Sequence, residues 1–128
     1  GDLIKYEGDN IIASFPSANA ALACVKSCQM QIHDYNKSRP KDFHMRIGFG
    51  LADGACTIIP GHDIIGPAFD RSFRMAEDLA EVGEVLITER VKASGYSSVH
   101  GKASISEAKP LEGVEGEQVM YNVLKFMM

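Results

Sequence analysis

The sequence predicts an α+β fold, in which helices pack on a largely antiparallel β-sheet. Short segments of β type recur along the chain, and helical segments of different length separate them. The 128 residues contain no internal repeat and no clear domain boundary, and this length suits one hydrophobic core. We therefore expect residues 1–128 to form a single domain.

Residues 1–36 predict two strands followed by a helix. The apolar segments LIKY and IIASF flank the turn signal EGDN at residues 7–10, which is typical of a hairpin. Ser17 is a candidate helix N-cap. Behind it, apolar side chains recur every three or four positions, which predicts one amphipathic helix ending near Asn36. These side chains are Ala18, Ala21, Leu22, Val25, Cys28 and Ile32.

The middle of the chain predicts a second hairpin. FHMRIGFGL at residues 43–51 alternates apolar residues with His44, Arg46 and Gly48, so we expect a strand. The dipeptide at residues 53–54, Asp-Gly, is a hairpin signal, and ACTII at residues 55–59 would then be the returning strand.

The remaining segments predict alternating helices and strands. Gly66 and Pro67 open a helix that runs to about Ala80. EVLIT at residues 84–88 predicts a short buried strand, and ERVKAS at residues 89–94 a short helix. Two or three strands follow, and the last of them ends in MYNVLKF.

Composition excludes several classes of protein. Hydrophobic residues make up 45% and charged residues 23%, as in ordinary globular proteins. No apolar run approaches the roughly 20 residues of a membrane span, and the first residues carry no secretory signal. We therefore expect a cytoplasmic location and no membrane contact from this segment, possibly within a larger or membrane-tethered protein. The net charge of −4 argues against a nucleic-acid partner.

Four segments share a family resemblance that no single motif would establish. They are KYEGDNIIASFPS at 5–17, MRIGFGLADG at 45–54, DIIGPAFDRSFRMAE at 63–77 and AEVGEVLITERV at 80–91. In this order and spacing they resemble the catalytic domain of class III adenylyl and guanylyl cyclases. The resemblance implies a ferredoxin-like nucleotidyl cyclase sandwich. Because that family's first strand has no counterpart here, we expect a partial domain, truncated at its N-terminus and inactive in isolation.

The same resemblance implies a reaction, a cofactor and a partner. The domain would convert ATP to cyclic AMP and pyrophosphate by two-metal-assisted attack of the 3′-hydroxyl, using Mg²⁺ or Mn²⁺. A second cyclase-like domain, identical or different, would complete the site as a dimer. Asp9 matches the second of the family's two metal-binding aspartates. From the residues alone, Asp9 suits either a Mg²⁺ ligand or an ordinary polar turn.

Lys5 and Asp63 match the two positions that read the purine in this family. A carboxylate accepts from the exocyclic amine of adenine, and an ammonium donates to its ring nitrogen. The pair therefore favours ATP over GTP. Taken singly, Lys5 also fits a solvated strand residue, and Asp63 a loop carboxylate near a helix start.

Three further residues match positions that handle the phosphates and the ribose. Arg46 matches a phosphate-binding arginine, although alone it resembles any exposed strand arginine. Asp70 and Arg74 lie four apart on one helical face, where the family has an asparagine that orients the ribose and an arginine that stabilises the transition state. With Asp70 in the asparagine's place, the two residues could instead form an ion pair.

Two acidic residues depart from the family pattern. Asp70 replaces the asparagine, and Leu111-Glu112-Gly113 stands where the family has Leu-Lys-Gly, whose lysine contacts the terminal phosphates. Each change puts a negative charge beside a polyanion. An alternative function follows, namely a catalytically degenerate pseudocyclase domain that acts in dimerisation, regulation or scaffolding.

Overall fold

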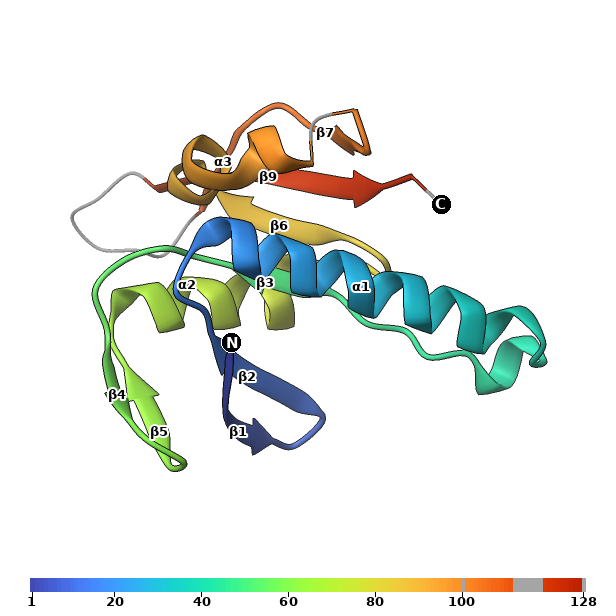
Figure 1. Ribbon diagram of the computed structural model, residues 1–128, viewed down its shortest axis with the longest axis horizontal. Coiled ribbons are helices and arrows are strands. Elements are labelled where there is room, and N and C mark those ends of the chain that lie inside the picture. The colour runs from blue at the N-terminus through green and yellow to red at the C-terminus, as the bar shows by residue number, and fades with distance from the viewer. Residues whose placement is uncertain (100, 112–118, 128) are drawn as a thin grey trace.

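A computed structural model describes residues 1–99, 101–111 and 119–127, and the side chains of these residues except those of residues 7 and 98. Figure 1 shows a central sheet with helices packed against it and two separate β-hairpins. The predicted α+β class with a largely antiparallel sheet is confirmed, because β3 and β6 form the one parallel pair among the described strands. Within the described residues, no helix has the length and apolar character needed to cross a membrane.

The central sheet has the order β3-β6-β9-β7, and β8 also pairs with β9. Its strands are β3 (Phe49–Leu51), β6 (Val85–Thr88), β7 (Ala103–Ile105), β8 (Lys109–Leu111) and β9 (Val119–Phe126). All four residues of β6 are buried, as the sequence predicted for this segment. Its alternating side chains serve two cores, one on each face of the sheet.

Helices α1 (Ala18–Lys37) and α3 (Glu89–Gly95) cover one face of the sheet. In the larger core, Leu22 of α1 and Val91 of α3 pack with Val85 of β6. Ser17 caps α1 as predicted, since its Oγ accepts a hydrogen bond from the backbone N–H of Ala20 at 3.1 Å. A short 3₁₀ helix, η3 (Tyr96–Ser98), follows α3.

Helix α2 (Pro67–Arg74) continues directly into a π-helical turn, η2 (Met75–Leu79), and together they cover the other face. Met75 packs there against Leu86 and Leu111. The backbone of β3 approaches α2 closely, because a Cβ on Gly50 would lie 2.3 Å from the carbonyl oxygen of Ser72. The helix predicted to run to about Ala80 is confirmed, with a change from α to π geometry at its end.

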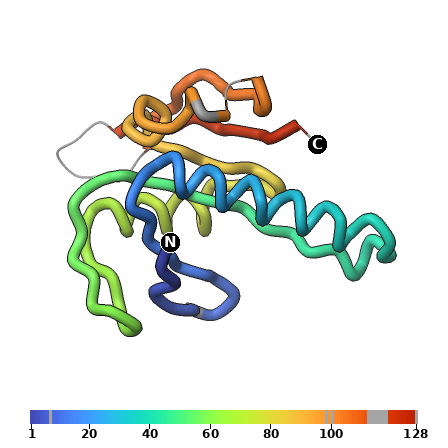
Figure 2. The backbone as a smooth tube through the Cα atoms, in the orientation of Figure 1, coloured from blue at the N-terminus to red at the C-terminus, as the bar shows by residue number. Residues whose placement is uncertain are grey.

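Two hairpins form separate two-stranded sheets, which lie on the same side of the molecule in Figure 2. The first pairs β1 (Asp2–Glu7) with β2 (Asn10–Ser14), and the second pairs β4 (Thr57–Ile59) with β5 (Asp63–Ile65). Gly8 takes a φ of 62° at the tip of the first hairpin. A glycine with positive φ at the first of two turn residues suits the twist of a tight hairpin.

The prediction of a second hairpin at residues 53–54 is wrong. Residues 44–48 have no regular structure, a 3₁₀ turn η1 (Lys41–Phe43) precedes them, and only residues 49–51 form a strand. This strand pairs in parallel with β6, while residues 57–59 pair with residues 63–65 instead. The alternation at residues 43–49 misled the prediction because Phe43 and Met45 are exposed, at 70% and 43%, and do not face a core.

Candidate functional site

Lys5 and Asp63 meet between the two hairpins. Lys5 lies in β1 and Asp63 begins β5, and the Lys5 ammonium donates to the Asp63 carboxylate, with 2.8 Å between Nζ and Oδ1. The same oxygen accepts a second hydrogen bond of 2.8 Å from the backbone N–H of Ile64. The two side chains keep 23% and 44% of their surface exposed, so the pair remains accessible to a ligand.

These contacts change the acidity of Asp63. The hydrogen bond from Lys5 lowers the pKa of the Asp63 carboxyl below its ordinary value, and the Ile64 N–H and the charge of Lys5 act in the same direction. Each of these groups stabilises the ionised carboxylate. Asp63 therefore presents a fixed anion beside a fixed cation at neutral pH.

The ring of Phe69 forms part of this arrangement, although the sequence did not single it out. The Lys5 ammonium lies 5.6 Å from the ring centroid, within the range of a cation–π contact. Phe73, one turn further along α2, packs against Phe69 with 5.7 Å between ring centroids. The sequence feature that could have indicated Phe69 is its position in the first turn of the helix that follows Asp63.

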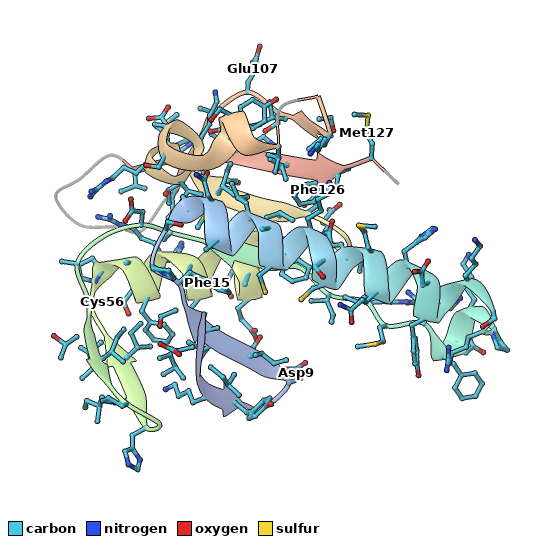
Figure 3. The ribbon with its side chains drawn as sticks, in the orientation of Figure 1. Asp9, Phe15, Cys56, Glu107, Phe126 and Met127 are labelled. Carbon is cyan, nitrogen blue, oxygen red and sulfur yellow. The ribbon has the colours of Figure 1, made fainter. Side chains whose placement is uncertain are left out.

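Asp9 lies apart from this pair, in the exposed turn of the first hairpin. Figure 3 shows it at the free end of β1 and β2. The next residue, Asn10, donates to the Glu77 carboxylate of η2 at 2.9 Å, which ties the hairpin to the end of α2. Among the described residues, no three His, Cys, Asp or Glu side chains gather as a metal site. Asp9 could therefore supply one carboxylate ligand, and the described residues do not form a complete metal site.

Asp70 and Arg74 both belong to α2, but they do not neutralise each other. No salt bridge joins them in the described part of the chain, so the ion pair considered from their spacing is absent. Asp70 is exposed. The Arg74 Nε is buried and finds no hydrogen-bond partner among the described residues. Either a water molecule or a ligand can supply the acceptor that this N–H lacks.

Arg46 has a different setting from the expected strand. It lies in the irregular segment before β3, it is exposed, and its Nη2 donates to the carbonyl oxygen of Lys41 at 3.4 Å. The second departure from the family pattern, Glu112, lies outside the described residues. Leu111, immediately before it, is buried at the end of β8.

The chain is similar to a curated protein and to a solved structure whose names include a cyclase. No protein-family model matches the chain. The chain is 28% identical over 107 residues to a protein of Rhizobium meliloti (strain 1021) named "Putative adenylate cyclase 3", and the match covers 82% of the chain. The chain spans only 17% of the length of that protein. It also superposes on the crystal structure of an adenylate/guanylate cyclase/hydrolase from Silicibacter pomeroyi with a TM-score of 0.80.

That superposition covers 97% of the chain and 72% of the solved structure at 19% sequence identity. The chain therefore has the fold of a nucleotidyl cyclase domain. Within this cyclase-like domain, the structure brings Lys5 together with Asp63 and adds Phe69 to them. Within the described residues, no hydrogen bond or salt bridge joins Asp9, Arg46 or Arg74 to that pair.

Proposed function

We propose that this cyclase-like domain binds ATP and takes part in its conversion to cyclic AMP and pyrophosphate. The observation that carries the proposal is the contact between Lys5 and Asp63 across two hairpins. Adenine offers an exocyclic amine donor beside a ring-nitrogen acceptor, which complements a carboxylate beside an ammonium. Guanine presents a carbonyl oxygen and an N–H in the same places, and would face the wrong partner at each. The names of the two similar proteins support a cyclase reaction.

The proposed reaction forms one bond and breaks another at the same phosphorus. The ribose 3′-oxygen attacks the α-phosphorus and gives its proton to solvent water, while the bond to the β,γ-pyrophosphate breaks and pyrophosphate leaves. Arg74 would donate from its unpartnered Nε to oxygens that gain negative charge in the transition state. Arg46, being exposed, would bind phosphate oxygens after releasing the Lys41 carbonyl. Asp70 would lie at the position that orients the ribose.

A divalent cation, Mg²⁺ or Mn²⁺, would supply charge neutralisation at the phosphates when bound. Asp9 would contribute one carboxylate ligand from the hairpin turn. Mg²⁺ in nucleotide sites commonly uses one or two carboxylates together with substrate phosphates, which fits a single exposed aspartate better than a closed protein cage.

We further propose that residues 1–128 act as one domain and pair with a second cyclase-like domain, identical or different. Exposed apolar side chains on the two hairpins support such a partner, because large apolar surfaces seldom remain in contact with water. On the first hairpin Tyr6 and Ile11 are 69% and 67% exposed, and on the second Ile65 is 58% exposed.

A catalytically degenerate domain is the second candidate, and Asp70 favours it. Its exposed carboxylate is not neutralised by Arg74, so it would repel a triphosphate held beside α2. Such a pseudocyclase would keep the fold and the dimer contacts while regulating or scaffolding a partner without turnover.

One experiment separates the two candidates. Purified full-length protein, shown to be folded and dimeric, is incubated with Mn²⁺ and either ATP or GTP, and cyclic nucleotide is quantified. Formation of cyclic AMP from ATP, abolished in Arg74→Ala, supports the cyclase. Binding of ATP without any cyclic product supports the degenerate domain. Cyclic GMP as the main product would overturn the adenine assignment.

A further inference from the structure

A carboxylate and an aromatic ring lie beside the Lys5 ammonium. The side chain leaves β1 and reaches the Asp63 carboxylate, with 2.8 Å between Nζ and Oδ1. It also passes over the ring of Phe69, with 5.6 Å from Nζ to the ring centroid. A lysine side chain is long and flexible, so one partly exposed carboxylate leaves it considerable rotational freedom. The negative face of an aromatic ring adds a second attraction for the ammonium and narrows that freedom.

Phe69 is itself held in place relative to Asp63. Gly66 links β5 to α2 in a backbone conformation with φ of 141°, and a Cβ at this position would lie 2.9 Å from the Cα of Cys56. The turn between Asp63 and Phe69 is therefore closely packed. Behind the ring, Phe73 packs at a tilt of 53° with 5.7 Å between centroids. Ala68, the residue before Phe69, is 7% exposed and anchors the first turn of the helix.

We propose that Phe69 is a specificity-determining positioning residue, whose ring holds the Lys5 ammonium beside Asp63 in the arrangement that selects adenine over guanine. The part of this inference that concerns adenine rests on the proposed function. Selection depends on the relative places of a donor and an acceptor, because both must meet the same edge of one nucleobase. A lysine released from the ring would leave Asp63 more often, and the site would lose the donor that adenine needs.

The test compares Phe69→Leu, which removes the ring, with Phe69→Tyr, which keeps it, in the full-length protein. The first measurement requires no nucleotide: the pKa of the Asp63 carboxyl is followed by NMR with carboxyl-labelled aspartate and assigned with Asp63→Asn. The second is titration calorimetry with the α,β-methylene analogues of ATP and GTP, which cannot release pyrophosphate. The ratio of the two dissociation constants reports selection.

Phe69→Leu is expected to raise the Asp63 pKa toward its ordinary value and to reduce the preference for the ATP analogue by about two- to fivefold. Phe69→Tyr is expected to keep both values. An unchanged Asp63 pKa and an unchanged preference in a folded Phe69→Leu protein would overturn the proposal. Equal losses in both variants would also overturn it, since they would indicate packing rather than ring–cation attraction. If the wild type binds neither analogue, the proposed function fails, and the Asp63 pKa alone decides whether Phe69 positions Lys5.

Discussion

Lys5 and Asp63 form an ion pair of 2.8 Å although 58 positions separate them in the chain. Within the described residues, the two hairpins that carry them share no backbone ladder. Their side chains therefore join two hairpins that the central sheet does not connect. The two groups proposed to read the purine therefore also hold the two hairpins together.

Exchanging the pair should change the preferred nucleotide. Glutamate at position 5 would accept from the ring N–H of guanine, and cysteine at position 63 would donate to its carbonyl oxygen. We expect Lys5→Glu with Asp63→Cys to weaken binding of ATP by about tenfold or more, because both polar groups of adenine would lose their partners. Binding of GTP should improve. Titration of both nucleotides against the double variant and the wild type measures the change.

The single variant Asp63→Ala provides the matched control for that exchange. It removes one partner without offering guanine a new one, so affinity for ATP should fall while affinity for GTP stays low. Equal affinity of the double variant and the wild type for both nucleotides would contradict the assignment of the purine site.

The lowered pKa of Asp63 predicts how acid affects the pair. A carboxyl whose pKa is lower in the folded state binds fewer protons there than in the unfolded state, so it stabilises the fold above its unfolded pKa, about 3.9. This contribution is lost as the pH falls through the lowered folded-state value. Urea unfolding between neutral pH and pH about 3 should show a smaller acid-dependent loss in Asp63→Asn than in the wild type. Parallel pH profiles for the two proteins would show that Asp63 gains nothing from Lys5.

The sequence predicted the elements whose local signals agree with their final packing. Ser17 and the amphipathic repeat behind it predicted α1 and its cap, and the segment at residues 84–88, with its apolar centre at residues 85–87, predicted the buried strand β6. It did not predict β5, because residues 63–65 are a strand only through their pairing with residues 57–59. The alternation at residues 43–48 is a local pattern, and no neighbouring strand among the described residues pairs with this segment, which becomes a strand only from Phe49.

The candidate site was predictable to the extent that single positions match a family pattern. Lys5 and Asp63 could be selected from the resemblance, but their mutual distance depends on how two hairpins fold toward each other. Phe69 was missed because an aromatic residue in an amphipathic helix ordinarily indicates core packing. Only the structure shows that its ring faces an ammonium group.

Restoring the family's residues at the two acidic positions should raise turnover. Asp70→Asn removes an exposed negative charge from α2, and Glu112→Lys exchanges a negative for a positive charge at a position outside the described residues. If both charges repel the triphosphate, the double variant of the full-length protein should form cyclic AMP about fivefold faster or more, given roughly 1 kcal/mol per exposed charge pair. Cyclic AMP production at ATP concentrations well below saturation, which reports kcat/KM, measures the gain.

Asp70→Glu with Glu112→Asp is the matched control for this double variant, since it keeps both negative charges and should give no gain in turnover. Robust wild-type activity that the restored residues do not increase would contradict the view that Asp70 and Glu112 impair the site.

Gly50 should be essential for placing α2 against the sheet. A Cβ at this position would lie 2.3 Å from the Ser72 carbonyl oxygen and 2.8 Å from the Ala76 backbone nitrogen, and neither backbone atom can move without shifting the helix. Gly50→Ala should therefore lower the free energy of unfolding by about 1–3 kcal/mol in urea titrations.

Gly61→Asn is the control for Gly50→Ala, because a Cβ at position 61 would meet no atom within 4 Å and asparagine tolerates the φ of 73°. This control should lower the free energy of unfolding by about 1 kcal/mol or less. An unfolding free energy for Gly50→Ala equal to that of the wild type would contradict the close contact between β3 and α2.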